Sequence, residues 1–185
     1  MAKKAVAELE PQTGDTALIK LGRIAWNGRL GAAANARRQL PRLAAEFFSL
    51  VAAALEGEPD AERLHRVRLA AKHIRYTLEL FRPCYGPALE ERIGRLRELQ
   101  QVLGEINDCA VTRRLVTNDS GPSPQRQKAE QFLAERLRQK VIELRQKWAA
   151  GMGDAREQRR WIQYLAKNAR EPRPPEAAKA KTRHA

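Results

Sequence analysis

Apolar residues recur at intervals of three and four along most of the chain, which is the spacing of helices that bury one face. The pattern is clearest between residues 64 and 82, where an apolar line runs beside a line of cations. The apolar line consists of Leu64, Val67, Ala71, Ile74, Leu78 and Phe81. The cationic line consists of His65, Arg68, Lys72, Arg75 and Arg82, interrupted by Glu79. Because the second line is shifted by one residue, the two lie about 100° apart around a helix. This stretch therefore predicts a helix that buries one flank and presents a column of positive charge beside it.

The same spacing predicts three further long helices, each bounded by residues that favour a helix end. The first starts at Pro41, since proline is tolerated in the first helical turn, and stops before Gly57. The others run from about Ala88 to Asn118 and from about Gln125 to Ala149. Short loops join these segments, and we predict an all-α protein built as an up-down four-helix bundle.

Shorter elements are predicted at the two ends of this bundle. Residues 17 to 26 have the spacing of a short helix, and Asp154 is placed to cap another one. We expect residues 1–15 to be flexible and residues 16–170 to form a single bundle. Residues 171–185 form a Pro-, Ala- and Lys-rich tail that cannot bury a core, and we expect it to be disordered.

Composition and charge point to a soluble helical protein with a polyanionic partner. The 185 residues are 43% hydrophobic, 31% charged and only 5% aromatic, and the formal net charge is +13. The excess is concentrated near the C-terminus, where residues 121–185 hold 16 basic and 7 acidic side chains. A field of this sign attracts nucleic acid, polyphosphate or anionic lipid, although a basic surface that serves only solubility is the plainer interpretation.

Cysteine and histidine usage predicts neither a disulfide framework nor a metal site. Cys84 and Cys109 are too few for the former, and neither they nor His73 have companions at metal-ligand spacing. We expect no cofactor. The first residues lack the apolar core of a secretory signal, and the most apolar run is far shorter than the ~20 residues that span a bilayer. The predicted location is the cytoplasm, without membrane contact.

Two motifs together resemble those of the CHAD family, the conserved histidine α-helical domains. The first is His65-x-x-Arg68-x-x-x-Lys72-x-x-Arg75-Tyr76, and the second is Leu-Gly-Glu-Ile-Asn-Asp at residues 103–108. The resemblance implies a helical, non-enzymatic module that binds inorganic polyphosphate along a basic groove. It makes four residues the candidate ligands, namely His65, Arg68, Lys72 and Arg75.

The resemblance also suggests supporting residues. Asn107 and Asp108 match the second motif, and we expect them to orient a cationic side chain, because a carboxylate repels phosphate but can hold an arginine or histidine. The expected packing also places four second-tier binding candidates near the column: Arg37, Arg38, Arg82 and Arg92.

The chain departs from the family pattern in one respect. CHAD proteins usually contain the helical unit twice, with the groove between two bundles, whereas the His-Arg-Lys-Arg signature occurs once here. We therefore predict a homodimer in which symmetry supplies the missing half.

Alternative functions remain open at this point. A nucleic-acid binder would suit the charge, but no recognition-helix or aromatic stacking motif is present. A histidine phosphotransfer protein could use His65, although the sequence has no phosphotransfer signature. If His65 instead binds phosphate, affinity should rise as the pH falls through about 6.5, where an imidazole gains its second proton.

Overall fold

The computed structural model describes residues 25–118, 121 and 123–172, and all regular structure within them is helical. The prediction of an all-α fold is confirmed. The helices are α1 (Ala32–Leu55), α2 (Ala61–Leu80), α3 (Arg82–Tyr85), α4 (Ala88–Asn118), α5 (Pro124–Gly151) and α6 (Ala155–Lys167). The predicted flexible N-terminus and most of the predicted tail lie outside the described residues. The predicted helix over residues 17–26 does too, except for its last two residues, which are not helical.

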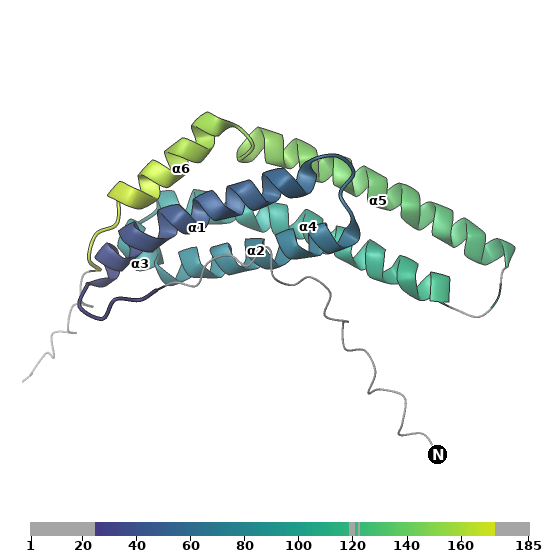
Figure 1. Ribbon diagram of the computed structural model, residues 1–185, viewed down its shortest axis with the longest axis horizontal. Coiled ribbons are helices and arrows are strands. Elements are labelled where there is room, and N and C mark those ends of the chain that lie inside the picture. The colour runs from purple at the N-terminus through teal and green to yellow at the C-terminus, as the bar shows by residue number, and fades with distance from the viewer. Residues whose placement is uncertain (1–24, 119–120, 122, 173–185) are drawn as a thin grey trace, which may run out of the picture.

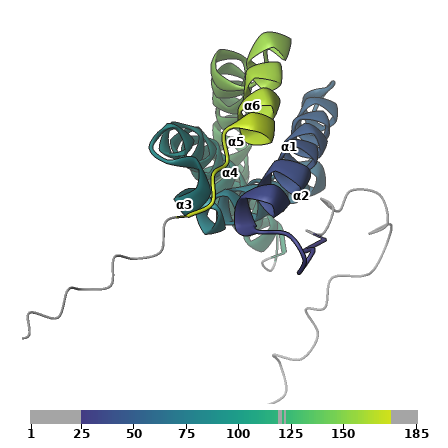
Figure 2. The ribbon, with the colours of Figure 1, turned by 90° about the vertical axis from the view of Figure 1, so that its left-hand side faces the viewer.

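Neighbouring helices pack in a simple order. α2 contacts both α1 and α4, α4 contacts α5, and α6 returns to cover α1. The end-on view in Figure 2 shows α6 in front of α5 at the top of the molecule, with α1 beside them and α2 and α4 lower. Figure 1 shows that α4 and α5 continue past the loop between α1 and α2. The four long helices predicted from the sequence are therefore present, and α6 joins them.

Large aromatic side chains from three helices meet in the core. The rings of Phe48 and Trp161 lie 5.7 Å apart, and those of Phe47 and Trp148 lie 6.3 Å apart. Trp161 is completely buried. Burying a side chain of this size contributes roughly 2–3 kcal/mol. α6 is thus an integral part of the fold rather than an appendage.

The first long helix begins earlier than the sequence predicts. α1 starts at Ala32, so Pro41 lies inside the helix and not in its first turn. The helix start is held by two polar side chains. Asn35 donates from Nδ2 to the carbonyls of residues 27, 30 and 31, at 3.0 to 3.1 Å. Glu171 accepts a hydrogen bond from the Ala33 N–H at 3.2 Å, in the place of a local N-cap.

The ends of the other helices follow the sequence more closely. Asp60 accepts from the N–H of Arg63 and caps α2. Asp154 accepts from the N–H groups of Arg156 and Glu157 and caps α6, as predicted. The predicted end of the central helix at Arg82 is wrong by a short distance. α2 ends at Leu80, and Pro83 lies in the first turn of α3, a single turn that leads into Gly86.

The buried face of α5 is shorter than its apolar stripe. Leu144 and Trp148 are buried, but Leu133, Leu137 and Val141, whose spacing predicts that they face inward, are only partly buried. The first half of α5 lies beside the projecting end of α4, beyond the loop that joins α1 to α2 (Figure 1). One neighbouring helix cannot cover a stripe that a bundle would bury.

Candidate functional site

The cationic column of α2, formed by His65, Arg68, Lys72 and Arg75, lies along the seam between α2 and α4, whereas Arg82 belongs to α3. At one end of the column, His65 Nδ1 is 3.1 Å from Asn107 Oδ1. At the other end, Arg75 Nε donates to Gln100 Oε1 at 2.8 Å. The apolar flank of α2 is buried as predicted, and these two contacts show which helix the basic flank faces.

The two cations in the middle of the column have no internal partner. Arg68 and Lys72 are partly exposed, and neither forms an ion pair or hydrogen bond with any residue between 25 and 172 that the structure describes. They are four residues apart on one helix, which separates them by about 6 Å along its axis. Two adjacent uncompensated charges of one sign repel each other, so an anion that contacts both would be favoured.

Arg75 differs from them because its charge is compensated within the protein. Its NH1 group lies 2.7 Å from Glu79 Oε1, and its guanidinium packs over the ring of Tyr76 at 4.2 Å. Only 16% of its side chain is exposed. Arg75 therefore closes the end of the column, and its fixed position suits a supporting role better than that of a free ligand group.

Glu79 connects the two helices through two arginines. It also accepts from Arg97 of α4 at 3.0 Å. Burial raises the pKa of the Glu79 carboxyl, but the hydrogen bonds and charges of Arg97 and Arg75 outweigh burial, and the pKa lies below its usual value. Glu79 thus stays ionised at neutral pH and neutralises part of the positive charge at this end of the seam.

On the α4 side of the seam, Asn107 is accompanied by residues to which the sequence motifs assigned no role. Gln100, Gly104 and Asn107 follow one another at helical spacing on the flank that meets α2, and Arg97 lies one turn earlier. Gly104 is part of the second motif, so the sequence alone draws attention to this residue. Its place opposite the column, and that of Gln100 and Arg97, depends on how α2 and α4 pack.

The two residues predicted to orient the column differ. Asn107 contacts His65, which agrees with an orienting role. Asp108 is exposed, and its carbonyl accepts from Thr112 within α4, but its carboxylate contacts no cation among the described residues. The structure does not bring Asp108 into the candidate site.

Three of the four second-tier arginines, Arg37, Arg38 and Arg92, have no ion pair or hydrogen bond that links them to the column within the described residues. Arg82 is connected to the Arg75 end of the column through a chain of ion pairs formed by Glu90, Arg97 and Glu79. Arg37 donates to the carbonyl of Ala169 near the start of α1. Arg92 packs over Tyr164 at 3.8 Å, and burial lowers its pKa. Arg82 pairs with Glu90 at 3.0 Å, and Arg38 is exposed and forms no ion pair or hydrogen bond with the described residues. Arg37 and Arg92 thus support the packing near α6, where α1 turned out to begin earlier than expected.

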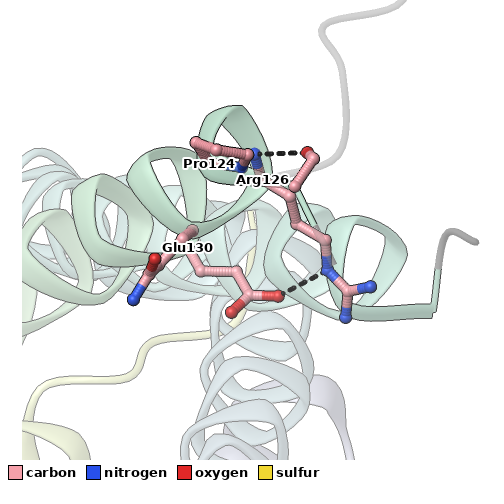
Figure 3. A pocket seen from close by; sticks show the side chains of 5 residues that line it. Pro124, Arg126 and Glu130 are labelled. Carbon is pink, nitrogen blue, oxygen red and sulfur yellow. Dashed lines mark hydrogen bonds and ion pairs between the residues drawn. The ribbon is translucent and has the colours of Figure 1, made fainter. Parts of the chain in front are cut away.

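A separate surface hollow lies at the start of α5 (Figure 3). Its central cation, Arg126, is already paired with Glu130 at 2.9 Å, and its backbone N–H donates to Ser123 Oγ at 3.1 Å. The hollow is lined by Ser123, Pro124, Arg126, Gln127 and Glu130. It lies at the far end of the α4–α5 projection from the column and shares no residue with it.

The described residues give no sign of other site types. They contain no group of three or more His, Cys, Asp or Glu side chains placed to hold a metal ion. Cys84 and Cys109 are both buried and unpaired. None of the helices between residues 25 and 172 has the length and apolar character needed to cross a bilayer.

Comparison with known families decides the relationship. The family model of the CHAD domain matches residues 3–117, well over half of the chain. The chain belongs to the CHAD family. No curated protein and no solved structure matched it. The CHAD match covers α1 to α4 almost to its end, so it contains both sides of the seam, whereas α5 and α6 lie outside it.

Proposed function

We propose that this CHAD protein binds inorganic polyphosphate along the seam between α2 and α4, as a binding module and not as an enzyme. The observation that carries the proposal is the pair Arg68 and Lys72, which lie side by side, partly exposed and without partners among the described residues. The family is associated with polyphosphate binding, and the family match includes this pair.

The geometry of the column suits an anion whose charge repeats along its length. His65 and Arg75 are about 15 Å apart along the helix axis, so several phosphate groups could be met at once. Arginine offers a forked donor to two oxygens, and lysine offers a compact charge. His65 lies at the open end of the column, with Asn107 fixing one ring nitrogen and leaving the other for the ligand.

Nucleic acid is the competing ligand, because its backbone presents the same charged groups. Binding of either polymer releases condensed counterions, so salt dependence alone does not separate them. A further alternative, phosphotransfer on His65, would leave a phosphorylated protein after the ligand is removed. The predicted homodimer and cytoplasmic location stay predictions.

The test is a competition experiment with the full chain. Polyphosphate of defined length and a single-stranded DNA of similar charge are each titrated calorimetrically, and each is then used to displace the other. We expect polyphosphate to displace DNA at a much lower phosphate concentration than the reverse, with polyphosphate recovered at unchanged length and no phosphate retained on the protein. Preferential retention of DNA would favour the nucleic-acid function instead.

A further inference from the structure

Gly104 occupies an unusual place in the longest helix of the protein. α4 has 31 residues, and Gly104 lies near its middle, where glycine disfavours a helix relative to alanine. The usual structural reasons for a glycine do not apply. A Cβ built at this position meets no atom within 4 Å, and Gly104 is not among the glycines with positive φ, which are Gly57, Gly86 and Gly121.

The position of Gly104 relative to the column follows from the two contacts that bracket it. Asn107 touches His65 and Gln100 touches Arg75, so α4 runs antiparallel to α2 along the seam. Gly104 lies between Gln100 and Asn107 and within about 60° of both around the helix. It is therefore opposite the stretch of α2 that carries Arg68 and Lys72, and it is itself partly exposed.

We propose that Gly104 is a specificity-determining residue of the polyphosphate site. Because it has no side chain, the surface of α4 stays open opposite Arg68 and Lys72, and a thin, unbranched phosphate chain can lie against the helix while both cations contact it. Nucleic acid carries a sugar and a base on every phosphate, so its backbone would gain less than a bare phosphate chain from close contact with a strip of surface freed of one side chain. The inference rests on the proposed function and names the feature that selects linear inorganic phosphate polymers.

The chain offers a matched control at Gly94. Gly94 is in the same helix, and a Cβ there also meets nothing within 4 Å. It lies about 15 Å further along the axis and about 80° further round, away from the flank that holds Gln100 and Asn107. Replacing either glycine with alanine has the same effect on the helix backbone, but only the change at 104 fills space in the seam.

The experiment measures polyphosphate affinity and thermal stability for Gly104→Ala, Gly104→Leu, Gly94→Ala and Gly94→Leu. Both alanine variants should raise Tm by a few degrees, because they favour the helix. Affinity should fall about threefold in Gly104→Ala and about tenfold or more in Gly104→Leu, while both Gly94 variants bind like the wild type. DNA affinity should change less than polyphosphate affinity at residue 104.

The outcomes separate this inference from the function on which it rests. If the wild type binds polyphosphate and Gly104→Leu binds it equally well, the role of Gly104 is refuted and the proposed function stands. Equal losses in the two leucine variants also refute it, since they would reflect the helix and not the seam. If the wild type does not bind polyphosphate, both proposals fail. Should Gly104→Leu lose its circular-dichroism signal, Gly104→Ala, which favours the helix, decides the question.

Discussion

Replacing Arg68 and Lys72 together with glutamine tests whether the open part of the column holds the ligand. A hydrogen bond to a charged group contributes about 1.5–3 kcal/mol when well shielded, and partial exposure reduces this to about 1 kcal/mol for each residue. The double variant should therefore bind polyphosphate about 30-fold more weakly, which corresponds to about 2 kcal/mol. Its stability should change by less than about 0.5 kcal/mol, because neither side chain has a partner in the described structure to lose.

The salt dependence of binding gives a second measurement on the same variant. Each phosphate contact of a single-stranded polyanion contributes roughly 0.7 to the slope of log affinity against log salt concentration. Losing two contacts should reduce the slope by roughly 1.4. Calorimetric titration with polyphosphate of one length, at about 50 and 200 mM salt, measures both quantities.

A control variant removes the same charge from another surface. Arg156 and Arg159 are exposed on α6, which packs against α1. Charges further from the ligand than the Debye length of about 10 Å are largely screened, so Arg156→Gln/Arg159→Gln should bind almost like the wild type. Equal losses in the two double variants would mean that binding follows net charge, and the reasoning about the seam would be wrong.

Four further outcomes are expected. In His65→Ala, the rise in polyphosphate affinity that a histidine ligand gives on acidification should disappear; a rise that persists would have to be assigned to another group. Glu79→Gln should bind polyphosphate more tightly, since Arg75 and Arg97 lose their counter-charge. Because the pKa of Glu79 is lowered by folding, its carboxylate stabilises the protein above the unfolded pKa, and this is lost as the pH falls through the lower folded pKa. The variant should thus be about 1 kcal/mol less stable in urea at pH 7, with no deficit near pH 2; an equal deficit at both would contradict this. Light scattering at high protein concentration should show a dimer, and a monomer that still binds polyphosphate would refute that prediction.

Local sequence signals were enough to place most of the helices. The predicted ends of α4 agree with the observed ones, because its apolar repeat is nearly unbroken and Pro87 precedes it. The start of α1 was missed because its cap is not local. Gly31 makes no side-chain cap, and Glu171 replaces it from the other end of the chain. A Cβ at residue 31 would collide with that carboxylate, so the glycine there depends on a contact that spacing cannot reveal.

The candidate site was predictable on one helix only. The spacing of His65, Arg68 and Lys72 follows from the helical period, and so does the flank that they share. The neighbour of that flank depends on packing, which explains why Gln100 and Arg97 received no role. The ion pair between Arg75 and Glu79 could have been predicted from the sequence, because the two residues are four apart on one helix. The sequence-based interpretation treated Glu79 only as an interruption of the cationic line.

The aromatic cluster has a consequence for which part of the chain can fold by itself. The family match stops at residue 117, but Phe47 and Phe48 pack against Trp148 and Trp161, which come from α5 and α6. A fragment ending where the match ends would leave these phenylalanine rings facing water and would lose the carboxylate that secures the first turn of α1. The recognisable segment and the self-sufficient folding unit are therefore different lengths of the same polypeptide, and the seam needs the longer one to keep its shape.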